Sequence, residues 1–192
     1  MQKGEYHEAN WVLANALKDA GYQSKLGSPL PVGDLKVVMG TSQGFKQYRR
    51  TLNMETGEVV VSWKDGSTTY ARSLFVSRSD DLIVYEIKAE DGLVNCEIQL
   101  DIHDQDKEYE KTRDIRTKSH YIYYAAQHPD ETDFGAVAKV INTGGSLATE
   151  DNKLIVKDAA SVLVWVKIFI KENRVEAWSK LEAELENENR CY

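Results

Sequence analysis

Residues 59–88 read VVVSWKDGSTTYARSLFVSRSDDLIVYEIK, and this stretch decides the fold. Its β-branched and aromatic residues gather in runs at 59–63, 68–75 and 82–88, separated by polar segments that contain Asp, Gly and Ser. Such runs are typical of β-strands joined by tight turns. Asp65-Gly66 is the clearest turn, because Asp and Gly tolerate the positive φ angles that a two-residue type I′ turn requires at both positions. We therefore predict consecutive antiparallel hairpins.

The same pattern extends in both directions along the chain. A strand is expected at 35–39, and the series of hairpins is expected to include 48–53 before this stretch and 94–102 after it. The charged residues 104–118 predict a long solvated loop, because they follow neither a helical nor a strand period. Later strands are predicted at 121–126, 134–142 and 154–157, with Thr143-Gly-Gly-Ser146 as a turn, and the apolar run 161–170 predicts a central strand buried on both faces.

A helix is predicted at each end of the strand-rich region. In residues 4–20 apolar side chains recur at intervals of three and four, and Gly21 is expected to end that helix. A similar stripe occurs in 175–188, formed by Val175, Trp178, Leu181 and Leu185. Strands and helices do not alternate, so we predict a mainly β fold, an antiparallel β-sandwich. The expected organisation is a helix and linker at 1–30, the sandwich at 31–172, and the start of a helical linker at 173–192.

Composition excludes several classes of function. The chain of 192 residues has 31 acidic and 24 basic residues, a net charge of −7 and a pI near 5.2. Its Lys and Arg residues are scattered, whereas a nucleic-acid-binding protein needs a clustered cationic face. We therefore expect no nucleic-acid partner and no membrane partner. The segment contains no signal peptide and no membrane-spanning run, and the sequence does not indicate a cellular compartment.

No motif predicts a catalytic, cofactor or metal site. The histidines lack the spacing of a zinc site, and residues 40–44, GTSQG, lack the Lys-Ser/Thr of a phosphate loop and are expected to be a strand-connecting turn. Cys96 is expected to be a buried apolar residue, with no disulfide to Cys191. A glycosidase needs two facing carboxylates, but the clustered acids lie where turn acids are the ordinary interpretation: Asp80, Asp81, Asp101, Asp104 and Asp106.

Aromatic residues are the remaining candidates for a binding site. Flat rings can stack on the apolar faces of sugars, and Tyr121, Tyr123 and Trp63 are the candidate carbohydrate-binding residues. The structural alternative is that tyrosines at alternate strand positions brace their cross-strand neighbours. Both interpretations remain open at this stage.

Several motifs together resemble a known family. In order, these are GEYHEA at 4–9, PVGDL at 31–35, YRRTLNMETG at 48–57, VVVSW at 59–63, YARSLFVSR at 70–78 and DLIV at 81–84. The series is similar to the N-terminal domain of glycoside hydrolase family 95, which contains α-L-fucosidases and related glycosidases. The resemblance covers nearly the whole chain and implies a super-sandwich that precedes an (α/α)₆ catalytic barrel. It also implies that the chain begins after the first strands of such a domain.

The resemblance implies a non-catalytic domain of a fucosidase-like enzyme, whose acid and base lie in the barrel. The implied partners are that barrel, in the same polypeptide, and the oligosaccharide substrate of the parent enzyme. Without the barrel, the stripe of the C-terminal helix is expected to be exposed and to allow a homodimer. The alternative is an independent sandwich module that binds carbohydrate or another protein.

Overall fold

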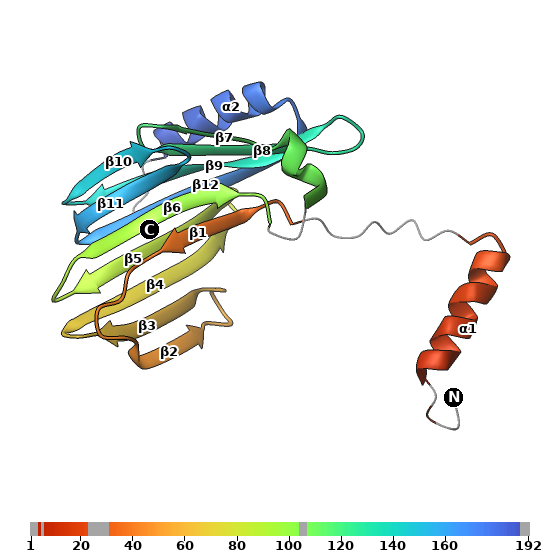
Figure 1. The fold of residues 1–192 in the computed structure, drawn as a ribbon, viewed down its shortest axis with the longest axis horizontal. Coiled ribbons are helices and arrows are strands. Elements are labelled where there is room, and N and C mark those ends of the chain that lie inside the picture. Colours follow the sequence, from red (N-terminus) through yellow and green to blue (C-terminus); the bar gives the residue numbers. More distant parts are fainter. Residues whose placement is uncertain (1–3, 5, 23–30, 104–106, 189–192) are drawn as a thin grey trace. The chain divides into compact units, whose positions relative to one another are not determined.

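The computed structural model describes residues 4, 6–22, 31–103 and 107–188 (Figure 1). The chain divides into two compact units, Met1–Leu30 and Pro31–Tyr192. Within the first unit, α1 (Tyr6–Asp19) confirms the predicted N-terminal helix. Gly21 has a φ of 81°, and the amide of Tyr22 donates to the Leu17 carbonyl at 2.9 Å, as in a Schellman motif. No helix in the described part of the chain is long and apolar enough to cross a membrane.

The second unit contains two antiparallel sheets, which confirms the predicted β-sandwich. The smaller sheet has the order β1 (Asp34–Val38), β6 (Val94–Asp101), β11 (Lys153–Ala159) and β10 (Ser146–Glu150). The larger has the order β2 (Lys46–Leu52), β3 (Val59–Asp65), β4 (Thr68–Ser77), β5 (Leu82–Glu90), β12 (Ser161–Glu172), β9 (Asp133–Thr143), β8 (Tyr121–Gln127) and β7 (Asp114–Lys118). A 3₁₀ turn, η1 (Lys107–Thr112), and a helix, α2 (Arg174–Asn187), complete the unit.

The hairpins from β2 to β5 confirm the prediction made from the opening stretch. The β3–β4 turn differs in detail, because Asp65 pairs with Thr68 and the two loop residues are therefore Gly66 and Ser67. Of these two residues only Gly66 has a positive φ, of 63°. A type I′ turn would need positive φ at both central positions, so the predicted Asp65-Gly66 turn is displaced by one residue and is of another type.

The prediction that 94–102 continues the hairpin series is wrong. After β5 the chain crosses to the other sheet, where β6 lies between β1 and β11. Alternate residues of β6 are buried, as they would be in either sheet. The period of the side chains identifies a strand with one buried face, and it carries no information on which sheet the strand joins.

The segment 104–118 is not the solvated loop that its charges suggested. Residues 104–106 lie outside the described residues, but 107–112 form η1 and 114–118 form the edge strand β7. Tyr109 is buried and packs edge-on against Phe134, with ring centroids 5.4 Å apart. Strand β10 was also not predicted. Both β7 and β10 are short edge strands whose exposed positions are mostly polar, so neither shows an apolar alternation.

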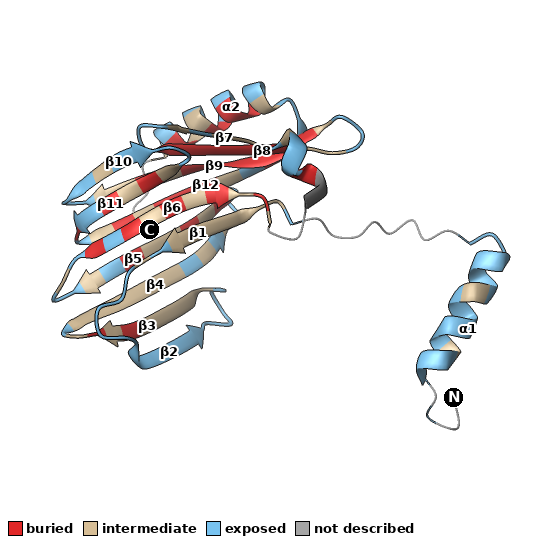
Figure 2. Cartoon of the chain, viewed as in Figure 1, coloured by how far each residue is buried: buried red, intermediate tan, exposed pale blue. Residues whose placement is uncertain are grey.

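Strand β12 is central, as the run at 161–170 predicted. It pairs with β5 on one side and β9 on the other. Val164 and Val166 are buried on one face and Trp165 and Phe169 on the other. Burial decreases across the large sheet from these strands to β2, where all seven residues are exposed (Figure 2).

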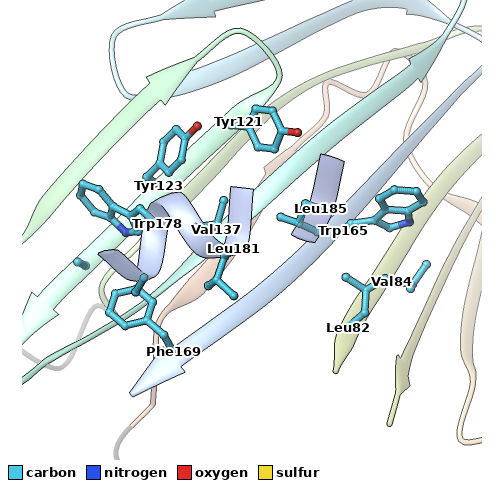
Figure 3. Close-up of a cluster of buried hydrophobic side chains, with 12 residues drawn as sticks. Leu82, Val84, Tyr121, Tyr123, Val137, Trp165, Phe169, Trp178, Leu181 and Leu185 are labelled. Atoms are coloured by element: carbon cyan, nitrogen blue, oxygen red, sulfur yellow. The ribbon is translucent and has the colours of Figure 1, made fainter. Parts of the chain in front are cut away.

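Helix α2 covers the part of the outer face of the large sheet that β8, β9 and β12 form, and its buried residues join these strands in one core cluster (Figures 1 and 3). Trp178, Leu181 and Leu185 are between 0% and 6% exposed, whereas Val175 at the start of the helix is 58% exposed. The expectation of an exposed stripe is therefore wrong. Three of its four residues belong to the core, so the stripe is not available to a second copy as the homodimer hypothesis required.

Candidate functional site

The candidate residues Tyr121 and Tyr123 lie on β8, under α2 (Figure 3). Their rings stack on each other with centroids 6.1 Å apart, and the Tyr123 ring is 5.7 Å from that of Trp178. Both tyrosines are less than 10% exposed. Neither ring offers a free face on which a sugar could stack, and the observed packing is the structural alternative, in which the rings brace the sheet and its covering helix.

The hydroxyl groups of these tyrosines face acidic side chains of α2. Tyr121 donates a hydrogen bond to the Glu186 carboxylate, which also accepts from the Lys139 ammonium at 3.0 Å. Burial, and then the hydrogen bond to Glu186, raises the pKa of Tyr121. The hydrogen bond from Tyr121, and then that from Lys139, lowers the pKa of Glu186. The phenol therefore stays protonated and acts as a donor that fixes the end of the helix.

Trp63, the third candidate, lies on β3 on the opposite face of the large sheet. It is 4% exposed and stacks on Tyr70 with centroids 5.3 Å apart. Phe45 contacts it edge-on at 5.9 Å, and the Arg72 guanidinium lies 4.6 Å from its ring centroid. The structure thus encloses Trp63 between neighbours and does not bring it together with Tyr121 and Tyr123.

The clustered acids satisfy local groups. The Asp80 carboxylate accepts from Ser77 and Ser79 in the β4–β5 turn. Asp101 accepts from the amide of Ile102 at 2.7 Å and from Arg113 at 3.1 Å. These acids belong to different sheets, and Asp104 and Asp106 lie outside the described residues. Across the described ranges, no group of three or more His, Cys, Asp or Glu side chains is placed to hold a metal ion.

The GTSQG segment at 40–44 joins β1 to β2, as predicted, and hydrogen bonds to the Asp65 carboxylate hold it in place. The carboxylate of Asp65 accepts from the amides of Ser42 and Gln43, each at 2.6 Å, and from the Ser42 hydroxyl at 3.1 Å. The amide of Ser42, followed by that of Gln43, lowers the pKa of Asp65. This loop is therefore anchored by an ionised acid at the end of β3.

Comparison with known proteins identifies the domain. The family model described as "Glycosyl hydrolase family 65, N-terminal domain" matches residues 1–169, which is most of the chain. The chain belongs to this family. Among solved structures, a putative kojibiose phosphorylase from the human microbiome matches with a TM-score of 0.55 and 13% identity over 79% of this chain. The chain spans 24% of the length of that phosphorylase. A search of curated proteins gave no match.

The match to a family 65 N-terminal domain supports the general class inferred from the sequence motifs, an N-terminal domain of a glycoside hydrolase. It does not support the particular family, family 95, that those motifs resembled. A sandwich domain of a carbohydrate-active enzyme was expected, and the matching family is of that kind. The finer assignment to family 95, with fucosidase-like specificity, is not supported by these matches. The motifs that suggested it describe strands and turns, and such features do not determine a substrate.

One residue of this family 65 domain that the sequence analysis did not single out is Arg72. Alternation along β4 places Arg72 on the same face as Tyr70 and Leu74. A charged residue on an otherwise apolar strand face is the signal in the sequence that could have identified it. Its Nη2 lies 3.4 Å from the Met39 sulfur, and its Nε is buried without a hydrogen-bond partner.

We expect Cys96 of the folded domain to resist thiol reagents. It is 4% exposed on β6, and burial raises its pKa to about 11. Since the thiolate is the nucleophile, alkylation of Cys96 by iodoacetamide at pH 8 should be at least about tenfold slower in the folded chain than in urea. Peptide mass spectrometry of Cys96 would measure both rates. Equal rates would contradict the prediction.

Proposed function

We propose that this chain is the non-catalytic N-terminal sandwich of a family 65-type enzyme that acts on glycosidic bonds. The observation that carries the proposal is the family match over residues 1–169. The length of the chain supports it as well, because the chain corresponds to about a quarter of the phosphorylase that it resembles in fold. The acid and base of the reaction would then lie in another part of the parent polypeptide.

In this role the domain supports a catalytic helical barrel in the same polypeptide, and the oligosaccharide substrate binds to the parent enzyme. Phosphorolysis is the first reaction to test, because the structural relative is described as a phosphorylase. Its 13% identity supports a shared fold and leaves the substrate of this protein a proposal. Hydrolysis of α-L-fucosides is the narrower alternative, suggested by the strand motifs quoted above.

The test compares the 192-residue chain with the product of the complete open reading frame that contains it. Both proteins would be assayed on kojibiose and on an aryl α-L-fucoside, with and without inorganic phosphate. We expect no turnover by the 192-residue chain and phosphate-dependent cleavage of kojibiose by the parent. Phosphate-independent release of the aryl group by the parent would favour the fucosidase alternative, and turnover by the 192-residue chain alone would contradict the proposed role.

An independent carbohydrate-binding module is the second hypothesis, with Tyr121, Tyr123 and Trp63 as its proposed residues. Because all three rings are buried, binding would require α2 or the partners of Trp63 to move aside. A glycan array probed with the 192-residue chain would test it. Binding that Trp63→Ala or Tyr123→Ala removes, in a variant that still folds, would favour this hypothesis over the supporting role.

A further inference from the structure

A cavity of about 550 Å³ lies between the two sheets and is not used by any function considered above. Its walls come from β1 and β6 of the smaller sheet and from β4, β5, β8, β9 and β12 of the larger one. Its volume falls within the range of roughly 300–1,000 Å³ that is usual for small-molecule sites. Most of its lining is aliphatic: Val32, Leu35, Val37, Leu74, Ile83, Leu100, Ala136, Val166 and Ile168.

Arg72 is the one charged residue in this lining, and no carboxylate lines the cavity with it. The described residues give the Arg72 guanidinium a weak thioether acceptor, Met39, and the ring face of Trp63, but no salt bridge. Its buried Nε has no acceptor. A guanidinium carries five N–H donors in a planar fork that suits a carboxylate, so this group lacks the partner that its chemistry favours.

The remaining polar side chains in the lining are the phenols of Tyr85 and Tyr124. Burial raises the pKa of Tyr85, which indicates a poorly hydrated wall, and the nearby Arg72 opposes that shift. A free sugar would bring many hydroxyl groups and find few acceptors here, so the lining does not suit carbohydrate. It suits a ligand with one anionic head and an apolar body.

We propose that this cavity binds an amphipathic monocarboxylate, with its carboxylate on the Arg72 guanidinium and its hydrocarbon body between the sheets. Charge complementarity selects the head group, because Arg72 is the single charge in the lining. The aliphatic residues of β1, β5 and β12 select the body. Removing apolar surface from water would contribute to the affinity, and the charge-assisted hydrogen bond would set the preference for an anion.

The experiment titrates the 192-residue chain with octanoate, octan-1-ol and octylammonium, which share a hydrocarbon chain and differ in head group. Calorimetry gives the affinities, and methyl NMR locates the ligand. We expect octanoate to bind at least about tenfold more tightly than octan-1-ol, the effect of one charge-assisted hydrogen bond. Octanoate should shift the methyl resonances of Leu35, Ile83 and Val166. Octylammonium should bind most weakly.

Variants test the two parts of the site separately. Arg72→Met should reduce octanoate affinity by about tenfold or more and leave octan-1-ol unchanged. The matched control is Arg116→Met, because the Arg116 guanidinium also lies over a tryptophan, 5.0 Å from the Trp178 ring, but does not line the cavity. Leu35→Trp would fill the cavity and should abolish binding of both ligands.

The proposal is overturned by any of three results: no octanoate binding, equal affinity for octanoate and octan-1-ol, or methyl shifts confined to residues outside the cavity. If Arg72→Met does not fold, the anion preference and the methyl shifts of the unmodified chain still decide the question. These outcomes are independent of the parent enzyme's activity, so they do not depend on the proposed function.

Discussion

Replacing Trp178 with alanine should lower the free energy of unfolding by about 3–5 kcal/mol, the usual effect of removing a large buried aromatic side chain. Trp178 is 6% exposed and joins α2 to the sheet by three contacts. Its ring lies against Tyr123, its indole N–H donates to the Tyr124 carbonyl at 3.3 Å, and the Arg116 guanidinium covers it. Urea denaturation followed by circular dichroism would measure the loss.

The control for this prediction is Val175→Ala on the same helix. Val175 is 58% exposed, so its replacement should change the free energy of unfolding by no more than about 0.5 kcal/mol. A loss of less than about 1 kcal/mol for Trp178→Ala would mean that α2 contributes little to the stability of the sandwich. The packing of α2 against β8, β9 and β12 would then be weak.

Replacing Asp133 with alanine should also lower the free energy of unfolding by about 3–5 kcal/mol, because it removes the nearest and only hydrogen-bonded carboxylate partner that the described residues give a largely buried guanidinium. The Asp133 carboxylate accepts from Arg174 Nη2 at 2.6 Å, from Nε at 3.1 Å and from the Arg174 amide at 3.0 Å. The Arg174 side chain is 19% exposed and that of Asp133 is 10% exposed. The pair joins the start of β9 to the start of α2. Urea denaturation at pH 7 would measure the loss.

The pair should also make stability depend on pH. The hydrogen bond from the Arg174 side chain is the main cause that lowers the pKa of Asp133 in the folded chain. Its contribution is therefore fully present above the unfolded pKa of about 3.9, and is lost as pH falls through the lower folded pKa. Unfolding free energies measured from pH 7 to pH 2 should fall less steeply below about pH 5 in Asp133→Ala than in the unmodified chain.

Asp114→Ala is the matched control, because Asp114 is the more distant carboxylate partner of Arg174, at 3.9 Å, and its side chain is 26% exposed. A partly exposed pair at the limit of ion-pair distance contributes at most about 1 kcal/mol. Equal effects of the two substitutions at pH 7 would contradict the importance given to Asp133.

The sequence predicted the strands better than their partners. Around Gly66 the local pattern determines a hairpin, because β3 and β4 are separated by only a short turn in the sequence and Gly66 supplies the positive φ of that turn. At Asp91, which has a φ of 57°, the chain turns in a similar local manner, yet the next strand enters the other sheet. That choice depends on long-range pairing with β1 and β11, which leaves no trace in the alternation of 94–102.

The candidate site was harder to predict than the fold, for a related reason. Alternation places Tyr121 and Tyr123 on one face of a strand, but it cannot show that α2 covers that face. The same limitation explains the wrong expectation for Trp178 and Leu185, since an apolar helical stripe packs equally well on a sheet of its own domain or on another domain. For Arg72, alternation along β4 already shows that a charged residue lies on an apolar face. The sequence does not show that the described residues give this guanidinium no carboxylate partner.

Because burial is uneven across the large sheet, its strands should differ in how readily they unfold locally. Each residue of β2 is exposed, whereas β12 is paired on both sides and buried on both faces. Amide hydrogen exchange should therefore be slowest in β12 and β9 and become faster strand by strand toward β2. The β2–β3 margin would then detach and re-form while the centre of the sheet stays folded. Among the strands of the large sheet, those of this margin should be the first that a protease cuts.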